Sequence, residues 1–155
     1  MKKNEIMQLG IKEAKKTMNN NIGGPFGAVI VKDNKIIAIA SNTVLSSKDP
    51  TAHAEINAIR KASKKLKTYD LSECTLYATG YPCPMCLSAI MWANIKQVYY
   101  GTTLNDAQKI GFRDDYIYNY IRNNNKGKEL NISNINREEC IKLFDEYNKK
   151  NKKTY

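Results

Sequence analysis

The sequence predicts an α/β layered domain, in which a mixed sheet is sandwiched between helices. Short apolar runs alternate along the chain with stretches of helical periodicity, and strands that alternate with helices favour this architecture. The chain has 155 residues, about the length of one domain. Its 42% hydrophobic and 26% charged residues are typical of a soluble globular protein.

The first elements predicted are a helix and a hairpin. Apolar residues at near-helical spacing predict a helix over residues 4–20, and Gly23-Gly24-Pro25 breaks that pattern. Two short apolar runs, residues 28–31 and 36–40, flank Asp33-Asn34. This arrangement predicts a β-hairpin with a two-residue turn.

The next elements alternate between helix and strand. Thr51 is expected to cap a helix that starts near Ala52. Residues 75–79 and 97–101 are predicted strands. Between them, Pro84 begins a predicted helix that runs through Trp92, because proline costs least in the first turn. The remainder of the chain is predicted to be mostly helical.

Two short segments carry the residues expected to do chemistry. His53 and Glu55 form an H-x-E motif at the start of one predicted helix, and Pro82, Cys83 and Cys86 form a P-C-x-x-C motif at the start of another. One nitrogen and two sulfur ligands leave the fourth tetrahedral position of zinc open, which is typical of a catalytic site. Helix N-termini also favour the thiolate form that metal binding requires.

The open position would take a water, whose pKa zinc lowers toward ~7. Glu55 lies two residues beyond His53, so it is placed to move that water's proton without binding the metal. His53 is the only histidine, and a lone histidine is more often a core or surface group. Its H-x-E context, and the lack of a second C-x-x-C that would close a structural site, favour catalytic zinc. A zinc-stabilised binding module remains the alternative of a different class, and Glu55 argues against it.

The other two cysteines and the N-terminal sequence help to predict the cellular compartment. Cys74 and Cys140 are isolated in apolar surroundings, and buried packing is the expected role of both. No apolar run approaches the ~20 residues of a membrane helix, and the N-terminus does not resemble a signal peptide. We therefore expect a cytoplasmic protein that makes no use of a membrane.

The chain is strongly basic, with 25 Lys and Arg against 15 Asp and Glu and a net charge of +10. Such a balance is compatible with a nucleic-acid partner. A general compositional bias toward Lys, Asn and Ile would also produce this positive charge without any nucleic-acid partner. Charge alone does not decide between the two.

These motifs resemble the cytidine deaminase superfamily, in the branch that holds cytosine, guanine and transfer-RNA adenosine deaminases. Within that branch the chain is most similar to the small bacterial guanine deaminases. The shared segments are residues 22–33, 49–55, 82–87 and 111–118, and a basic tail that ends in Tyr155. The resemblance implies a three-layer α-β-α sandwich with a central mixed five-stranded sheet, and one Zn2+ per subunit held by His53, Cys83 and Cys86.

The resemblance also implies substrate contacts. Asn42 would hydrogen-bond the edge of the base, Phe26 would line the pocket, and the backbone at Ala54 would contact ring atoms of the base. Asp114 would lie near the substrate, and Tyr155 would close the site. Simpler roles remain open for three of them, because Asn42 could end a strand, Asp114 could cap the following helix and Tyr155 could be a frayed terminus.

Residues 1–155 are thus expected to form one deaminase domain. Its C-terminal helical segment, about residues 112–155, would swap between the subunits of a homodimer, as in those relatives. The implied reaction is hydrolytic deamination of guanine to xanthine and ammonia. Cytosine, another amino-substituted base or a transfer-RNA adenosine is the alternative substrate. Most of the superfamily has Glu where this chain has Tyr81, and this departure bears on the identity of the substrate.

Overall fold

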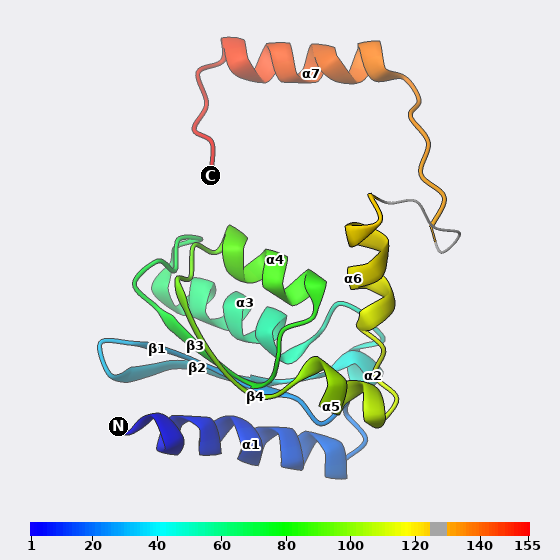
Figure 1. The fold of residues 1–155 in the computed structure, drawn as a ribbon. Coiled ribbons are helices and arrows are strands. Elements are labelled where there is room, and N and C mark those ends of the chain that lie inside the picture. The colour runs from blue at the N-terminus through cyan, green and yellow to red at the C-terminus, as the bar shows by residue number, and fades with distance from the viewer. Residues whose placement is uncertain (125–129) are drawn as a thin grey trace. The chain divides into compact units, whose positions relative to one another are not determined.

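The computed structural model describes residues 1–124 and 130–155. The chain divides into two compact units, Met1–Asn119 and Tyr120–Tyr155. The first unit contains the sheet with its covering helices, and Figure 1 labels the elements in chain order. No helix among the described residues is both long enough and apolar enough to cross a membrane.

The sheet of the first unit has four strands in the order β2-β1-β3-β4. These are β1 (Gly27–Lys32), β2 (Lys35–Ser41), β3 (Thr75–Gly80) and β4 (Gln97–Thr102). β1 is antiparallel to both β2 and β3, and β3 is parallel to β4. The predicted mixed sheet is therefore confirmed.

The β1–β2 connection is the predicted two-residue hairpin. Asp33 and Asn34 have φ angles of 50° and 59°. Two consecutive left-handed residues suit a tight hairpin turn, because its twist matches that of the flanking strands. Asp and Asn tolerate this conformation better than most residues, so this sequence signal is confirmed.

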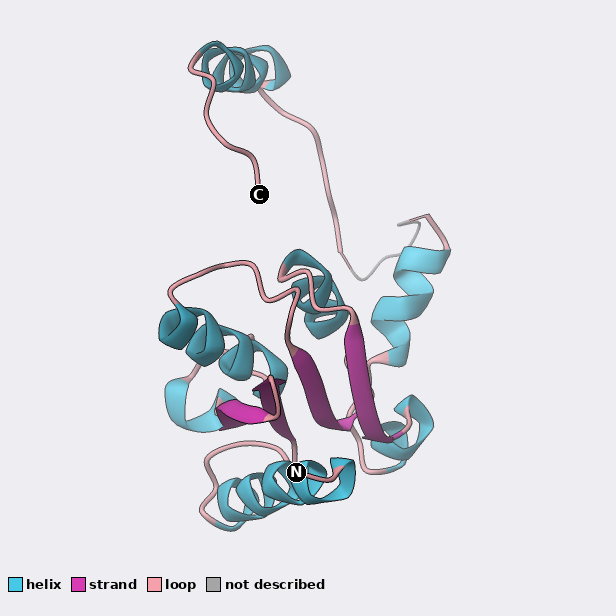
Figure 2. Ribbon diagram, turned by 90° about the vertical axis from the view of Figure 1, so that its left-hand side faces the viewer, coloured by secondary structure: helices cyan, strands magenta, loops and turns pink. Residues whose placement is uncertain are grey.

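Helices cover both faces of the sheet, as the cyan helices around the magenta strands show in Figure 2. α1 (Lys3–Asn19) lies on one face, and α3 (Ala54–Leu66) and α4 (Pro84–Trp92) lie on the other. Because successive residues of a strand point to opposite faces, β1 serves both layers. The three-layer arrangement is therefore confirmed.

The burial pattern of β1 shows how the layers are held together. Ala28 and Ile30 belong to the core on the α3 side, and Val29 and Val31 belong to the core on the α1 side. Ala28, Val29 and Ile30 are completely buried. Burial on both faces explains why this strand is a continuous apolar run in the sequence.

The prediction of a fifth strand is wrong, because the sheet has four strands among the described residues. After β4 the chain forms α5 (Leu104–Lys109) instead of another extended segment. A capping box starts this helix, in which Thr103 and Asp106 exchange side-chain and backbone hydrogen bonds. These bonds satisfy the free N–H groups of the first helical turn, and β4 is left as an edge strand.

The start of α3 also differs from the prediction. The helix begins at Ala54 with His53 as its N-cap residue, two positions later than expected. Thr51 does not cap it, because its hydroxyl and its backbone N–H both donate to Asp49 Oδ1. One short helix, α2 (Val44–Ser47), was not expected at all.

The last helices are α6 (Asp115–Arg122) and α7 (Arg137–Lys149). α7 lies in the second unit and carries Cys140, whose side chain is exposed. Its expected role in buried packing is therefore wrong, whereas Cys74 is buried as expected. The hydroxyl of Tyr118, on α6, donates a hydrogen bond to the Pro82 carbonyl beside the second cysteine motif.

Candidate functional site

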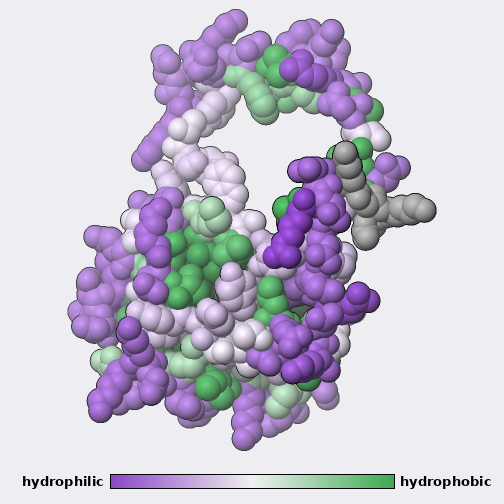
Figure 3. Space-filling view, viewed as in Figure 1, coloured by the Kyte–Doolittle hydropathy of each residue, from purple (hydrophilic) through white to green (hydrophobic). Residues whose placement is uncertain are grey.

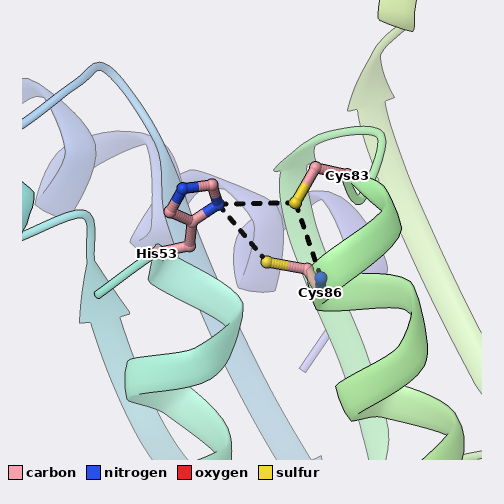
Figure 4. A group of neighbouring side chains, drawn as sticks. All are labelled: His53, Cys83 and Cys86. Carbon is pink, nitrogen blue, oxygen red and sulfur yellow. Dashed lines mark hydrogen bonds between the residues drawn. The ribbon is translucent and has the colours of Figure 1, made fainter. Parts of the chain in front are cut away.

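Two helix N-termini bring the three expected metal ligands together. His53 is the N-cap residue of α3, and Cys83 is the N-cap residue of α4, with Cys86 one turn further along. His53 Nδ1 lies 3.5 Å from the sulfur of Cys83 and 3.5 Å from that of Cys86. Figure 4 shows the three side chains pointing toward one another.

This geometry fits a tetrahedral zinc ion. Bonds of about 2.1 Å to nitrogen and about 2.3 Å to sulfur at tetrahedral angles separate the two donors by about 3.6 Å. Both nitrogen–sulfur distances are close to that value, and all three ligand atoms lie within 4.8 Å of one another. One imidazole and two thiols are the donor types that zinc prefers. His53, Cys83 and Cys86 thus form the site of one Zn2+.

The two thiols lie in an environment that favours one thiolate even before a metal binds. A hydrogen bond from the Cys86 thiol lowers the pKa of Cys83 to about 4, and His53 acts in the same direction. The backbone N–H of Cys86 also donates to the Cys83 sulfur, at 3.5 Å. The same thiol–thiol bond and burial raise the pKa of Cys86. A metal cation that replaces the shared proton would stabilise both thiolates.

Glu55 lies beside this group in the first turn of α3. The residue is 8% exposed. Burial raises the pKa of its carboxyl group, because low polarity disfavours the charged form. The structure thus places Glu55 within reach of the metal site, and three other residues supply the ligands.

A cavity of about 460 Å³ opens onto this group. Its lining includes His53, Cys83 and Glu55 together with Phe26, Asn42 and Asp114, three of the residues expected to contact substrate. The other lining residues are Gly23, Gly24, Val44, Leu45, Pro50, Tyr81 and Phe112. A largely apolar cavity with a few converging polar groups is the usual form of a small-molecule site.

Asn42 presents a defined hydrogen-bonding group to the cavity. It is 5% exposed, and its Oδ1 accepts hydrogen bonds from the backbone N–H groups of Gly24 and Val44, at 3.3 and 3.1 Å. Two donors on the oxygen fix the orientation of the amide. The NH2 group is therefore the part of Asn42 that is left to donate to a ligand.

Aromatic rings form another part of the lining. Phe26 and Phe112 pack edge to face with their ring centroids 4.9 Å apart. Tyr81, the residue that replaces the usual Glu, packs edge to face against Tyr100 of β4 at 5.0 Å. Asp114 lies near these rings and the metal group, and burial raises the pKa of its carboxyl group.

Two expected substrate contacts are not among the cavity residues. Ala54 is completely buried at the first position of α3. Tyr155 belongs to the second unit and is 84% exposed, and its role in closing the site stays a prediction.

The sequence patterns missed several lining residues. The apolar contribution of Val44 and Leu45 comes from α2, which no periodicity predicted. The approach of Phe112 to Phe26 joins two distant parts of the chain. Pro50 was marked only as part of residues 49–55, through the resemblance to relatives.

Comparison with known proteins identifies the family. The model of the cytidine and deoxycytidylate deaminase zinc-binding region matches residues 1–102. The guanine deaminase of Bacillus subtilis is 48% identical over 139 residues, which cover 89% of each chain. The tRNA-specific adenosine deaminase of Buchnera aphidicola subsp. Schizaphis graminum is 39% identical over 123 residues, 79% of each chain.

Solved structures give the same result. The X-ray structure of guanine deaminase from Bacillus subtilis superimposes with a TM-score of 0.95 at 43% identity, over 100% of this chain and 99% of that one. Guanine deaminase from Nitrosomonas europaea matches with a TM-score of 0.69 at 28% identity, over 74% of this chain and 66% of that one. With its zinc ligands in place and residues 1–102 matched by the family model, the chain belongs to the cytidine and deoxycytidylate deaminase family.

Proposed function

We propose that the protein catalyses the zinc-dependent hydrolytic deamination of guanine, which yields xanthine and ammonia. The observation that carries this proposal is the cavity, in which His53, Cys83 and Glu55 lie beside the amide of Asn42 and the carboxyl group of Asp114. The identity of 48% with a guanine deaminase over 89% of the chain supports this substrate.

The cavity complements a purine that has both donors and acceptors on its edges. The NH2 group of Asn42 would donate to a carbonyl or ring nitrogen, because its oxygen is occupied by two backbone donors. Asp114 would accept a hydrogen bond from a ring N–H or an amino group. The Phe26–Phe112 pair offers apolar surface to a planar ring. A base that leaves one of these polar groups unpaired would bind less well.

In the proposed mechanism Glu55 moves the protons. Zinc, when bound, supplies Lewis-acid chemistry that lowers the pKa of a water toward about 7 and makes it a nucleophile at neutral pH. Glu55 would take one proton from the attacking water and donate it to the ring nitrogen next to the amino-bearing carbon. It would then take the second proton from the hydroxyl group formed on that carbon and pass it to the amino group, so that ammonia leaves and a carbonyl group remains.

The enclosure around Glu55 supports this assignment. Its burial raises the pKa of the carboxyl group above the ordinary value, and a carboxyl group with a raised pKa gives up a proton less readily to bulk water. The apolar side chains of Leu45 and Phe112 line the same cavity.

A transfer-RNA adenosine deaminase is the second candidate. The 39% identity with a tRNA-specific adenosine deaminase and the net charge of +10 favour it. Part of that charge has a structural use, however. The ammonium groups of Lys61 and Lys65 donate to the backbone carbonyls of Ile39 and Ile36 on the edge strand β2, which protects an open sheet edge.

Measuring ammonia release distinguishes directly between these two candidate functions. The zinc-loaded protein is incubated separately with guanine, cytosine, adenine and a transfer RNA. We expect ammonia from guanine at a kcat/KM at least about 100-fold above that for the other bases, as buried hydrogen-bonding groups allow. Faster release from the RNA would favour the second candidate, and release from none would exclude both.

We further propose that the protein is a homodimer whose C-terminal segment exchanges between subunits. In support, α4 exposes Met91 and Trp92, each at 70%, and hydrophobic surface lies open on this side of the sheet (Figure 3). The second unit exposes Leu143 and Phe144 on α7. Sedimentation should give twice the monomer mass, and a monomer at micromolar concentration would contradict this.

We also propose that the protein works in the cytoplasm. Cys74, Cys83 and Cys86 are free thiols buried in the first unit. Thiols that serve as metal ligands are preserved where the surroundings are reducing.

Gly23 provides a test of the role of Asn42. A Cβ atom at this position would lie 2.2 Å from the backbone oxygen and 2.4 Å from Oδ1 of Asn42. Gly23→Ala should therefore displace the amide and lower kcat/KM for guanine by about 10-fold to 100-fold, as small misplacements do. Steady-state kinetics with a zinc assay measures this effect.

Gly10→Ala is the matched control. A Cβ atom there meets its nearest neighbours, in Val29 and Thr79, at 3.5 Å, an ordinary contact distance. This variant should retain wild-type kinetics, since Ala also favours the helix. Equal kinetics in Gly23→Ala and wild type would show that Asn42 does not take part in substrate recognition.

A further inference from the structure

Asn57 joins the strand end that carries Asn42 to the helix that carries His53. It lies half-buried in the second turn of α3. Its side-chain NH2 group donates to the backbone oxygen of Ser41 at 2.9 Å and to the hydroxyl oxygen of Thr43 at 3.0 Å. These two acceptors belong to the residues immediately before and after Asn42.

The same NH2 group also reaches the other side of the site. It lies 3.3 Å from the backbone oxygen of Ala52, the residue before His53. The Thr43 N–H donates to that oxygen as well, at 2.9 Å. Residues 41–43 and 52–53 are therefore tied together through one side chain and one backbone bond.

Asn42 itself has few other anchors. Its backbone N–H donates to the Phe26 oxygen at 3.0 Å, and its Oδ1 accepts from Gly24 and Val44. These bonds orient the amide within the loop, but none of them joins the loop to α3. Among the contacts described, the Asn57 side chain and the Thr43–Ala52 backbone bond together hold this substrate-binding segment next to the residue that precedes a metal ligand.

We propose that Asn57 is a positioning residue that holds the Asn42 amide at a fixed place relative to the zinc site. The inference rests on the proposed function, since it assumes that Asn42 binds the base. Asn57 is not among the residues that line the cavity, and the bonds described for its side chain go to Ser41, Thr43 and Ala52 rather than to the side chain of a metal ligand. It acts on the reaction through the backbone that flanks Asn42.

The test compares Asn57→Asp with wild type. The substitution keeps the size of the side chain but removes the NH2 group, so a carboxylate faces the carbonyl oxygens of Ser41 and Ala52, to which it cannot hydrogen-bond. Of the three former partners, the Thr43 hydroxyl is the one that can donate to it. We expect kcat/KM for guanine to fall by about 10-fold to 100-fold, with a larger change in KM than in kcat. Zinc content should stay at one per chain.

A double-mutant cycle with Asn42→Ala tests the route of the effect. If Asn57 works through Asn42, Asn57→Asp should cost little in the Asn42→Ala background. Independent, multiplying losses in the cycle would overturn the proposal. Loss of zinc from Asn57→Asp would also overturn it, because the effect would then lie on the metal ligands.

Hydrogen exchange supplies a measurement that does not depend on activity. In Asn57→Asp the amides of Asn42 and Thr43 should exchange about tenfold faster or more, because their segment is released. Unchanged exchange over residues 41–53 would overturn the inference. If the wild-type protein deaminated no base, the proposed function would fail, and this measurement would still decide the role of Asn57.

Thr17→Val is the matched control variant. The Thr17 hydroxyl donates to the hydroxyl of Ser41, so the variant removes a buried bond at the same strand end. It contacts neither the backbone at Asn42 nor that at Ala52 in the bonds described. Thr17→Val should keep the wild-type KM even if the protein becomes less stable. A KM raised as much as in Asn57→Asp would mean that any weakening of the strand end has this effect, and would overturn the proposal.

Discussion

Replacing Glu55 with glutamine is expected to lower kcat for guanine by about 100-fold to 10,000-fold, the usual contribution of a positioned proton carrier. The amide keeps the shape of the side chain but cannot accept the proton of the water. Ammonia release under saturating guanine measures the effect.

The same variant should keep its zinc and its fold. The metal ligands are His53, Cys83 and Cys86, so zinc analysis should still give one ion per chain. Burial raises the pKa of Glu55, which means that enclosing its charged form is unfavourable, and a neutral amide removes that cost. Thermal unfolding of Glu55→Gln should therefore occur no earlier than in wild type.

Glu13→Gln is the matched control for this prediction. Glu13 is a half-buried glutamate of α1 that lines a separate hollow with Lys16 and Arg60. The identical chemical change there should leave kcat unaltered. If Glu55→Gln kept more than one tenth of the wild-type kcat, Glu55 would not be the proton carrier, although the zinc site would remain intact.

The metal group was predictable from the sequence because its geometry is local. Cys83 and Cys86 are one helical turn apart, and His53 caps its own helix. Spacing along a helix fixes where such side chains point. The relative positions of these side chains can therefore be predicted from a short motif. The hairpin at Asp33-Asn34 was predictable for the same reason, since two adjacent residues determine the turn.

The count of strands was less predictable, because it came from resemblance to relatives. In this chain the residues after β4 contain a capping signal, Thr103 followed by Asp106 three residues later. That signal was present in the sequence and favours α5 over a strand. The prediction that α3 starts near Ala52 was wrong because the Thr51 hydroxyl bonds to Asp49 and does not cap the helix. Thr side chains often form such local hydrogen bonds in place of a helix cap.

The wall of the cavity was the least predictable part. Phe112 meets Phe26, and Tyr81 meets Tyr100, only through the tertiary fold. No periodicity marks these pairs, because Phe26, Phe112 and Tyr81 lie outside the helices and strands. Tyr81 therefore acquired a definite position only from the structure, at the cavity wall and against β4.

Replacing Cys86 with serine is expected to abolish zinc binding and to reduce deamination below detection. Cys86 is completely buried and lies 3.5 Å from His53 Nδ1. A serine hydroxyl remains protonated at neutral pH and is a poor zinc ligand compared with a thiolate. Metal analysis and ammonia release measure the two losses on the same sample.

The loss of metal should also destabilise the first unit. Zinc held by His53, Cys83 and Cys86 would join the N-termini of α3 and α4. A ligand at 1,000 times its dissociation constant stabilises a fold by about 4 kcal/mol. For a chain of this length that corresponds to a fall in Tm of roughly 10 °C. Wild type treated with a chelator should show the same fall, and added zinc should restore wild type but not Cys86→Ser.

Cys74→Ser separates the loss of a ligand from the loss of a buried thiol. Cys74 is 4% exposed and packs in the core on the α3 side, outside the metal group. This variant should unfold at a lower temperature, because a hydroxyl replaces a sulfur in an apolar site, yet it should keep its zinc and its activity. If Cys86→Ser behaved in the same way and retained one zinc per chain, the metal would be held by other residues, and the assignment of Cys86 as a ligand would be wrong. If Cys86→Ser lost both zinc and activity while Cys74→Ser kept both, the reaction would depend on this ligand set.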